Sequence, residues 1–167
     1  MRMVPNKAKR KLGRYVFQSG LATMIVFFIL LWLDVLLGPA IVASLGATSF
    51  IVFAMPRSRA ARPRALLGSY VIGALAGILC SLAATSSPAV STGIAADKLE
   101  VLFAALAVGL AILAMVTTDT GHPPAAGLAL GLVTDTWDWH TIVFALSAVI
   151  FLALVKRLLR NVLMDLT

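Results

Sequence analysis

The sequence predicts an all-α fold, a polytopic transmembrane helical bundle of about six segments. The first observation is a composition that is 60% hydrophobic and only 13% charged, with a mean hydropathy of +0.99, whereas about a quarter of a soluble domain is charged. The second is a series of long runs without Asp, Glu, Lys or Arg, namely 15–33, 35–56, 65–96, 101–118 and 141–155. The third is that the basic residues cluster at the ends of these runs.

The composition also limits the function. The net charge is +7, but the basic residues flank apolar runs, which indicates membrane topology and lipid contact rather than nucleic-acid binding. The single cysteine, Cys80, allows no disulfide within the chain and is interpreted as a small core residue. The first apolar run is longer than the core of a signal peptide and lacks a small-residue cleavage site, so we expect no cleavage.

The first part of the chain predicts two crossings and a return to the cytoplasm. Residues 1–14 form a basic flank that the positive-inside rule places in the cytoplasm. A first span follows over about 15–36, and a Gly-Pro break leads to a second span over 39–55. This second span is short, about 25 Å at the helical rise, and its centre is small and hydroxylated. The loop 56–64 carries four arginines and should be cytoplasmic.

The third and fourth spans are expected over 65–82 and 98–118. Gly73 and Gly77 form a GxxxG pattern in the third span, which we interpret as a closely packed helix face. The loop 84–97 is rich in Ser, Thr, Ala and Gly and contains no Lys or Arg. We therefore place this loop outside the cytoplasm.

The stretch 117–131 breaks the apolar pattern with hydroxyls, a carboxylate, an imidazole and two consecutive prolines. A residue before proline avoids the α region, so the preceding helix should end by Gly121, and His122 and Pro123 should be extended. Pro124 can then open a new helix, because its missing N–H costs nothing at the first position. The free N–H groups and the dipole of such a helix start favour an anion.

Residues 124–134 allow two topologies. As a helix the segment is only about 16 Å long, so it could be re-entrant, with the C-terminus outside, or a short fifth span, with the C-terminus inside. The inside is favoured by the basic residues after the last span, Lys156, Arg157 and Arg160. We therefore predict six crossings, with an outer interface belt over 135–140 and a last span over 141–155 and somewhat beyond.

These assignments predict one transmembrane domain over 15–160, after the basic flank 1–14 and before a C-terminal tail over 161–167. Both termini are expected in the cytoplasm, and the membrane is expected to be a bacterial inner membrane. The expected partners are the lipid bilayer and further copies of the chain in a homo-oligomer.

The two short spans share a sequence pattern. Pro39-Ala-x5-Gly46 opens the second span and Pro124-Ala-x5-Gly131 opens the fifth. Each is the middle member of a group of three segments, and three spans per group give the groups opposite orientations. An inverted 3+3 repeat is one arrangement that fits, and the N-termini of the two short helices would then approach one site from opposite membrane faces.

His122 is the leading candidate for a binding residue, because an ionisable group within a membrane is costly. Its imidazole, with the N–H groups of Ala126 and Gly127, could hold a small anion. The alternative is a structural histidine that bonds to a nearby carbonyl at the helix junction. The hydroxyls of Thr117, Thr118 and Thr120 could add donors or bond back to their own helix.

Asp119 would repel an anion. It could lie at the cytoplasmic surface, pair with an arginine of 57–64, or be protonated in the membrane. The residues predicted to bind the substrate are His122, Pro123, Pro124, Ala126, Gly127, Thr118, Thr120, Asp119, Gly46, Thr48 and Ser49.

We expect no metal, no cofactor and no catalytic centre. The candidate metal ligands show none of the HxxxH, HExxH or CxxC spacings; they are His122, His140, Asp119, Asp135 and Asp138. A GxSxG motif, a Gly-rich phosphate loop and a recognisable nucleophile and base pair are also missing from the sequence, so we predict that the protein is not an enzyme.

At the break, the residues Thr-Gly-His-Pro-Pro-Ala at 120–125 resemble the signature of the HPP family of integral membrane proteins. Earlier blocks resemble the family's Gly-Ala-Ser/Thr, Pro-x-Ser-Pro and Gln-Pro-Arg-Asn-x-x-Gly patterns in the same order, at 46–49, 53–58, 61–64 and 67–68. The resemblance covers roughly residues 15–158. Arg62, Ala65 and Tyr70 depart from it, since they stand where the family usually or often has Gln, Asn and His.

The resemblance implies a small-anion permease with four or more spans. Nitrite is the best-named substrate, because members of the family have been assigned to nitrite transport in plastids and cyanobacteria. The alternative is a non-transporting membrane module that binds lipid or a partner protein. The sequence leaves open the substrate and coupling ion, and whether transport is channel-like or coupled.

Overall fold

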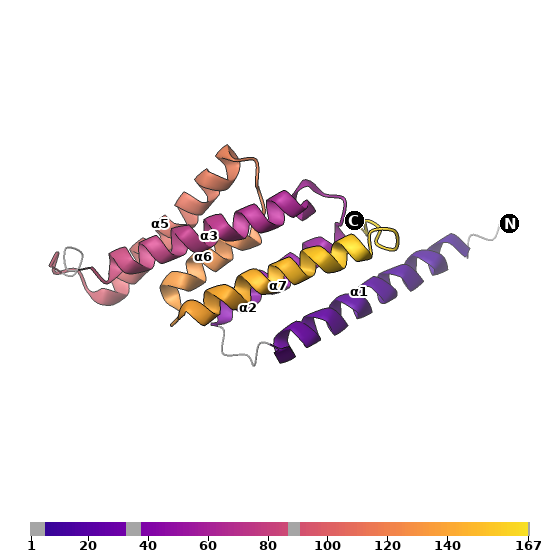
Figure 1. Cartoon of the computed structure of the whole chain (residues 1–167), viewed down its shortest axis with the longest axis horizontal. Helices are drawn as coiled ribbons and strands as arrows, with labels where there is room; N and C mark the ends of the chain where they lie inside the picture. The colour runs from indigo at the N-terminus through magenta and orange to yellow at the C-terminus, as the bar shows by residue number, and fades with distance from the viewer. Residues whose placement is uncertain (1–5, 33–37, 87–90, 167) are drawn as a thin grey trace.

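The computed structural model describes residues 6–32, 38–86 and 91–166. Within these ranges the chain is helical (Figure 1). The elements are α1 (Asn6–Trp32), α2 (Pro39–Ala54), the 3-10 turn η1 (Arg59–Ala61), α3 (Pro63–Ala84), α5 (Ala96–Thr117), α6 (Pro124–Thr134) and α7 (Trp139–Leu158). The described residues form no strand, and the all-α membrane bundle expected from the sequence is confirmed.

The helices differ in length. α3, α5 and α7 are long and apolar enough to cross a membrane, with mean hydropathies of 2.0, 2.5 and 2.1 over 18 residues. Shorter apolar helices are formed by α2, by α6 and by Gly13–Ile29 within α1. Proline occupies the start of α2, α3 and α6, where its fixed φ suits the helix and its missing N–H leaves no donor unpaired.

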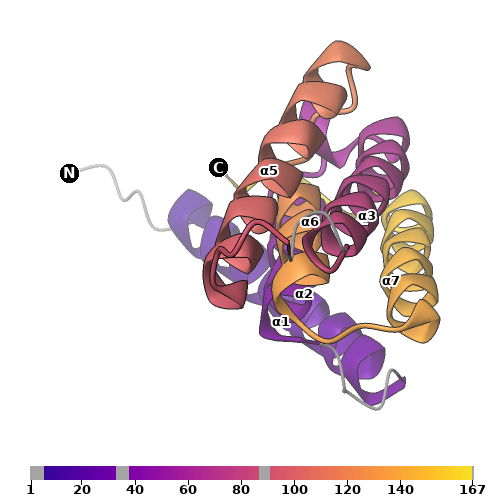
Figure 2. The ribbon, with the colours of Figure 1, turned by 90° about the vertical axis from the view of Figure 1, so that its left-hand side faces the viewer.

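The two short Pro-started helices, α2 and α6, lie at the centre of the bundle with the other helices around them (Figure 2). They are antiparallel. Gly131, near the end of α6, packs against Ala40 and Ile41 at the start of α2. Pro124, at the start of α6, is instead level with Ser44, which donates a hydrogen bond to its carbonyl.

The packing of α3 gives the direction of α6. Successive glycines of α3 lie beside successive residues of the α5–α6 region, as the pairs Gly68–Thr120, Gly73–Ala125 and Gly77–Ala129 show. The indole of Trp137, just before α7, donates to the hydroxyl of Ser81 near the end of α3 (3.1 Å). α6 therefore runs parallel to α3, and α7 begins beside the C-terminal end of α3. This direction is the one expected of a short fifth span, which stays a prediction.

The helices form two groups of three with opposite directions, as an inverted repeat requires. α3 packs on α6 as α7 packs on α2, and α5 packs on α6 as α1 packs on α2, but the extensive packing of α3 on α5 has no comparable counterpart between α7 and α1. Because the six α-helices of the described residues alternate in direction, α1 begins and α7 ends at the same end of the bundle (Figure 1). We call this the basic end; it is formed by residues 55–62 and 156–166.

The expectation that the N-termini of the two short helices approach one site is wrong. α2 and α6 overlap in opposite directions: α2 begins beside Gly131, near the C-terminal end of α6, whereas α6 begins beside Ser44, in the N-terminal half of α2. The start of α2 is level with Gly131, whereas the start of α6 is level with Ser44 and Thr48. Only one of the two helix starts can therefore contribute to a site at His122.

The GxxxG pattern of α3 is a closely packed face, as predicted. A Cβ on Gly77 would lie 2.9 Å from the carbonyl oxygen of Ala129 and 2.8 Å from the Cβ of Leu132. A Cβ on Gly73 would overlap the carbonyl oxygen of Ala125. The two glycines let the backbones of α3 and α6 approach closely, which suits helix association in lipid.

Gln18 links α1 to the end of α2 and to the C-terminal tail. Its side chain is 2% exposed. Its amide donates to the carbonyl of Phe53 (2.7 Å) and to that of Met164 (3.0 Å), and the N–H of Leu166 donates to the carbonyl of Ala54 (2.8 Å). The carbonyls of Phe53 and Ala54 are among those that a helix end leaves without partners. Gln18 was not predicted to have a role, although a long polar side chain in a charge-free run is a signal of one.

Candidate functional site

The site begins where α5 ends. The N–H groups of Asp119 and Thr120 donate to carbonyls in the last turn of α5, at 3.4 and 2.9 Å, which is the Schellman pattern. Asp119 has φ 53°, the left-handed conformation, which aspartate tolerates better than most residues. Its side chain is exposed. Arg64 donates to the backbone carbonyl of Thr118 (2.9 Å) and so binds the helix end at this surface.

The expectation of an extended Pro123 is wrong. Pro123 has φ −51° and ψ −37°, a helical conformation, so its carbonyl faces the first turn of α6. It accepts a hydrogen bond from the N–H of Ala126 (3.0 Å), and the carbonyl of His122 accepts one from the N–H of Ala125 (3.0 Å). These two bonds offset the steric cost of a helical residue before proline. As a result, the N–H of Ala126 already has a partner in this conformation.

The imidazole of His122 is enclosed by the protein. Its side chain is 0% exposed. Nδ1 lies 2.8 Å from the carbonyl oxygen of Ala60 in η1, and Nε2 lies 2.9 Å from Oγ1 of Thr48 in α2. A carbonyl oxygen only accepts, so Nδ1 donates to Ala60. His122 therefore joins the start of α6 to both the basic end and the central helix.

Three hydroxyls continue the hydrogen bonding from His122 into the bundle. The phenol oxygen of Tyr70 lies 2.7 Å from Oγ1 of Thr48 and 2.9 Å from Oγ of Ser44. Oγ of Ser44 in turn donates to the carbonyl of Pro124 (2.6 Å). The four side chains are at most 4% exposed and come from α2, α3 and the α5–α6 connector. We call Ser44, Thr48, Tyr70 and His122 the polar cluster.

Some of the predicted site residues meet at this cluster. His122 and Thr48 belong to it, and Pro124 accepts one of its hydrogen bonds. Gly127 packs against Ser44, whose Cβ would lie 3.4 Å from a Cβ on the glycine.

The other predicted residues lie outside the cluster's hydrogen bonds. The hydroxyls of Thr118 and Thr120 bond to each other (2.7 Å), and that of Thr118 also bonds back to α5. Gly46 is exposed on α2, and the hydroxyl of Ser49 bonds back to its own helix. Thr117 likewise bonds back to α5.

Two members of the polar cluster were missed as site residues. Ser44 stands four residues before Thr48, so the two share a helix face, and this spacing could have identified it. Tyr70 entered only as a departure from the family pattern. A phenol in a charge-free run generally needs a hydrogen-bond partner, which was the available signal.

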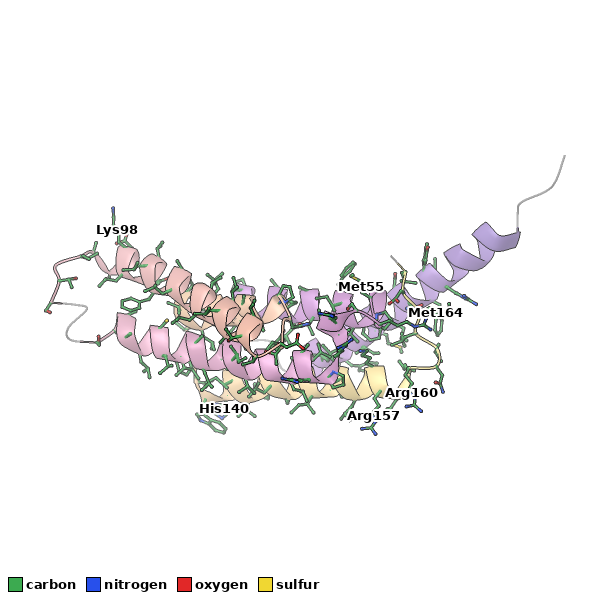
Figure 3. The ribbon with its side chains drawn as sticks, turned by 90° about the horizontal axis from the view of Figure 1, so that it is seen from above. Met55, Lys98, His140, Arg157, Arg160 and Met164 are labelled. Atoms are coloured by element: carbon green, nitrogen blue, oxygen red, sulfur yellow. The ribbon has the colours of Figure 1, made fainter. Side chains whose placement is uncertain are left out.

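Basic side chains surround the cluster at the basic end. Lys156 of α7 donates to the carbonyl of Ala61, the residue after the partner of His122. Exposed arginines occupy the adjacent loop, namely Arg57, Arg59, Arg62 and Arg64. Figure 3 shows Arg157 and Arg160 at this same end of the bundle, with Lys98 far away at the other. Among the described residues, no carboxylate forms a hydrogen bond with the cluster.

The opposite end holds a second, exposed group of polar residues. The carboxylate of Asp138 caps α7 by accepting from the N–H of Thr141 (2.9 Å), and it lies 2.9 Å from Nδ1 of His140. The bond from Thr141 and then that from His140 lower the pKa of Asp138 to about 2. Trp139 stacks on His140 with ring centres 3.7 Å apart, in the predicted interface belt.

A protein-family model described as "HPP, transmembrane region" matches residues 8–165. The chain belongs to the HPP family. The match covers the polar cluster and both short Pro-started helices of this HPP protein, and it confirms the resemblance seen in the sequence motifs. Comparison with curated proteins gives no match, and neither does comparison with solved structures.

Proposed function

We propose that this HPP protein moves a small monovalent anion across the membrane, with nitrite the first substrate to test. The observation that carries the proposal is the polar cluster, four buried polar side chains at a helix break within an apolar bundle. Buried ionisable groups in membrane domains are costly, and they commonly mark a transport pathway. The resemblance to the HPP family supplies the class of substrate.

The charges near the cluster favour an anion. The four exposed arginines of the loop 56–64 give the basic end a positive potential, which concentrates anions there. The carboxylate of Asp119 is exposed, and so it stands outside the polar cluster. We infer that the basic end faces the cytoplasm, as the positive-inside rule implies.

His122 has to exchange partners for an anion to bind. In the described conformation both ring nitrogens contact protein atoms. An anion would take the Nδ1–H that now points to Ala60, together with the hydroxyl of Thr118 or Thr120 and the N–H of Gly127. We expect a movement of α2 against α3 and α6 to open this junction, as broken helices move in transporters built from inverted repeats.

Uptake of labelled nitrite into proteoliposomes tests the proposal. His122→Ala removes one hydrogen bond to a charged ligand, worth roughly 1.5–3 kcal/mol, so we expect an affinity about ten-fold or more lower. His140→Ala is the matched control, because His140 is exposed at the opposite end of the bundle, and we expect no change.

The wild-type protein and the His122→Ala variant together distinguish a failure of the transport proposal from a wrong position of the anion site. If the wild-type protein moves none of nitrite, nitrate, formate and chloride, the transport proposal falls and the alternative membrane module stands. If a well-folded His122→Ala variant keeps the wild-type affinity and flux, the anion site lies elsewhere and His122 is a structural residue of the junction.

The expected homo-oligomer stays a prediction, and the mass of the detergent-solubilised protein would test it.

A further inference from the structure

The polar cluster has fewer hydrogens than hydrogen-bonding contacts. A continuous chain of five contacts runs from Pro124 to Ala60, and its two ends are carbonyl oxygens that only accept. The contacts are Pro124 O–Ser44 Oγ, Ser44 Oγ–Tyr70 Oη, Tyr70 Oη–Thr48 Oγ1, Thr48 Oγ1–His122 Nε2 and His122 Nδ1–Ala60 O. With a neutral imidazole, the three hydroxyls and the ring supply one hydrogen each, which leaves one contact without a hydrogen.

The direction of each bond follows from the two ends. If every contact is to contain a hydrogen, Ser44 gives its single hydrogen to Pro124 and Tyr70 must donate to Ser44. Thr48 then donates its one hydrogen to Tyr70. The carbonyl of Ser44, 3.0 Å from Oγ1 of Thr48, competes for the same hydrogen. Nothing is left on Thr48 to donate to Nε2 of His122. Since Nδ1 donates to Ala60, all five contacts are satisfied only when both ring nitrogens carry hydrogen.

We propose that Nε2 of His122 is a proton-binding site, and that the protein carries one proton together with each anion. The proposal rests on the proposed anion transport. The lone pair of Nε2 takes a proton from water on the side where the anion enters and returns it to water on the other side, so no other bond is made or broken. One proton and one monovalent anion together carry no net charge.

The groups that face His122 explain why the proton and the anion would bind together. α2 and α6 contain no ionisable side chain, and α3 contributes the phenol of Tyr70. The charged groups around the loop and the connector are mostly cations, namely Arg57, Arg59, Arg62, Arg64 and Lys156. The carboxylates are Asp119 of the connector and Asp165 of the C-terminal tail, which accepts a hydrogen bond from the N–H of Arg57 (3.0 Å). A buried imidazolium beside cations is costly without a counter-charge. A bound anion supplies that charge, so each ligand raises the affinity of the other by the same factor.

Protonation would also be transmitted to α6. With a neutral ring, the hydrogen of Thr48 can point to Nε2 and that of Tyr70 to Thr48, which leaves the Ser44–Tyr70 contact without a hydrogen. With an imidazolium, the hydroxyls of Thr48 and Tyr70 reverse, and Ser44 regains a donor while it bonds to Pro124. Protonation of His122 therefore changes the hydrogen bonding where α2, α3 and the first residue of α6 meet, which is a contact between the two groups of helices.

Exchange and accumulation of nitrite in proteoliposomes test the inference. Exchange of labelled for unlabelled nitrite without a pH gradient measures transport alone. Accumulation driven by a more acidic exterior measures coupling, with protein-free vesicles as the background for nitrous acid that crosses the lipid. We expect the gradient to speed wild-type accumulation at least ten-fold, and a potential set by potassium and valinomycin to have no effect. In His122→Gln, whose amide bonds but does not titrate, any remaining exchange should lose its pH dependence.

Tyr70→Phe gives a sharper test, because it removes the shortage of hydrogens. Without the phenol, Thr48 can donate to a neutral His122, and the imidazolium loses its advantage. We expect the pH dependence of wild-type exchange to shift about one unit lower, the size of one hydrogen bond. The matched control is Ser69→Ala, the neighbouring buried hydroxyl of α3, which bonds back to Leu66 and should leave the profile unchanged.

The outcomes separate this inference from the proposed function. If the protein exchanges nitrite but a pH gradient drives no accumulation, or if Tyr70→Phe keeps the wild-type profile, the proton site is refuted and anion transport stands. If the membrane potential alone drives accumulation, one-to-one coupling is refuted. If no anion exchanges at all, the proposed function falls, and the coupled proton with it.

Discussion

The contact between α3 and α6 predicts the effect of one added methyl group. In Gly77→Ala the new Cβ would lie 2.9 Å from the carbonyl oxygen of Ala129, whereas ordinary contacts begin at 3.4 Å. The near atom is backbone, and the Cβ of Leu132 at 2.8 Å allows no side-chain rotation to relieve it. The helices must therefore separate by about half an ångström, and overpacking of this kind costs about 1–3 kcal/mol.

The matched control is Gly109→Ala in α5, where nothing lies within 4 Å of the added Cβ. Alanine is the better helix former by up to about 1 kcal/mol, so this variant should be as stable as the wild type or more stable. For a chain of this length 1 kcal/mol shifts the Tm by about 2–4 °C, so we expect Gly77→Ala to unfold roughly 2–12 °C lower in detergent. Equal Tm values for the two variants would show that the close approach of α3 and α6 does not exist.

Three further predictions concern residues outside the polar cluster. Gln18→Leu leaves the carbonyl of Phe53 without its donor, so we expect a loss of about 1–3 kcal/mol, measured as a lower unfolding temperature; an unchanged value would mean that the tail docks without this bond. Asp119→Gly should keep or raise stability, because glycine adopts positive φ freely, and should keep nitrite uptake; lost uptake in a stable variant would give the carboxylate a role. The pKa of Asp138 is lowered from 3.8 to about 2, so its cap is fully present above pH about 4 and is lost as the pH falls through about 2. The protection of the Thr141 amide, its exchange rate compared with that of an unstructured peptide at the same pH, should fall over that window, but not in Asp138→Asn, which keeps a capping oxygen. A wild-type protection that does not change with pH would contradict the cap.

The sequence alone was enough to predict the helices. A chain in lipid has to satisfy its backbone hydrogen bonds internally, so long charge-free runs become helices whatever their packing. Proline is nearly neutral only at the first position of a helix, and the observed starts at Pro39 and Pro124 agree with that rule. Basic residues after the last span favoured a crossing by 124–134, and the direction of α6 agrees with it.

The sequence was less informative about the site. It singled out His122 and Thr48, because a histidine and a hydroxylated stretch are conspicuous in apolar segments. It did not show that Ser44 and Tyr70 join them, nor that Pro123 is helical, nor that the starts of α2 and α6 lie apart. Each of these depends on which helix faces lie against each other, at distances along the chain that local patterns do not reach.

The physical reason lies in the lipid. In water, an apolar stripe marks the face of a helix that turns inward, but a helix in a bilayer is apolar on all sides and gains nothing by hiding one of them. Packing then depends on small residues and hydrogen bonds, such as Gly77 beside Ala129 and Thr48 beside His122. The sequence therefore determined that the chain is a helical membrane protein and where its two short helices begin. Only the tertiary structure decided which hydroxyls surround the buried histidine.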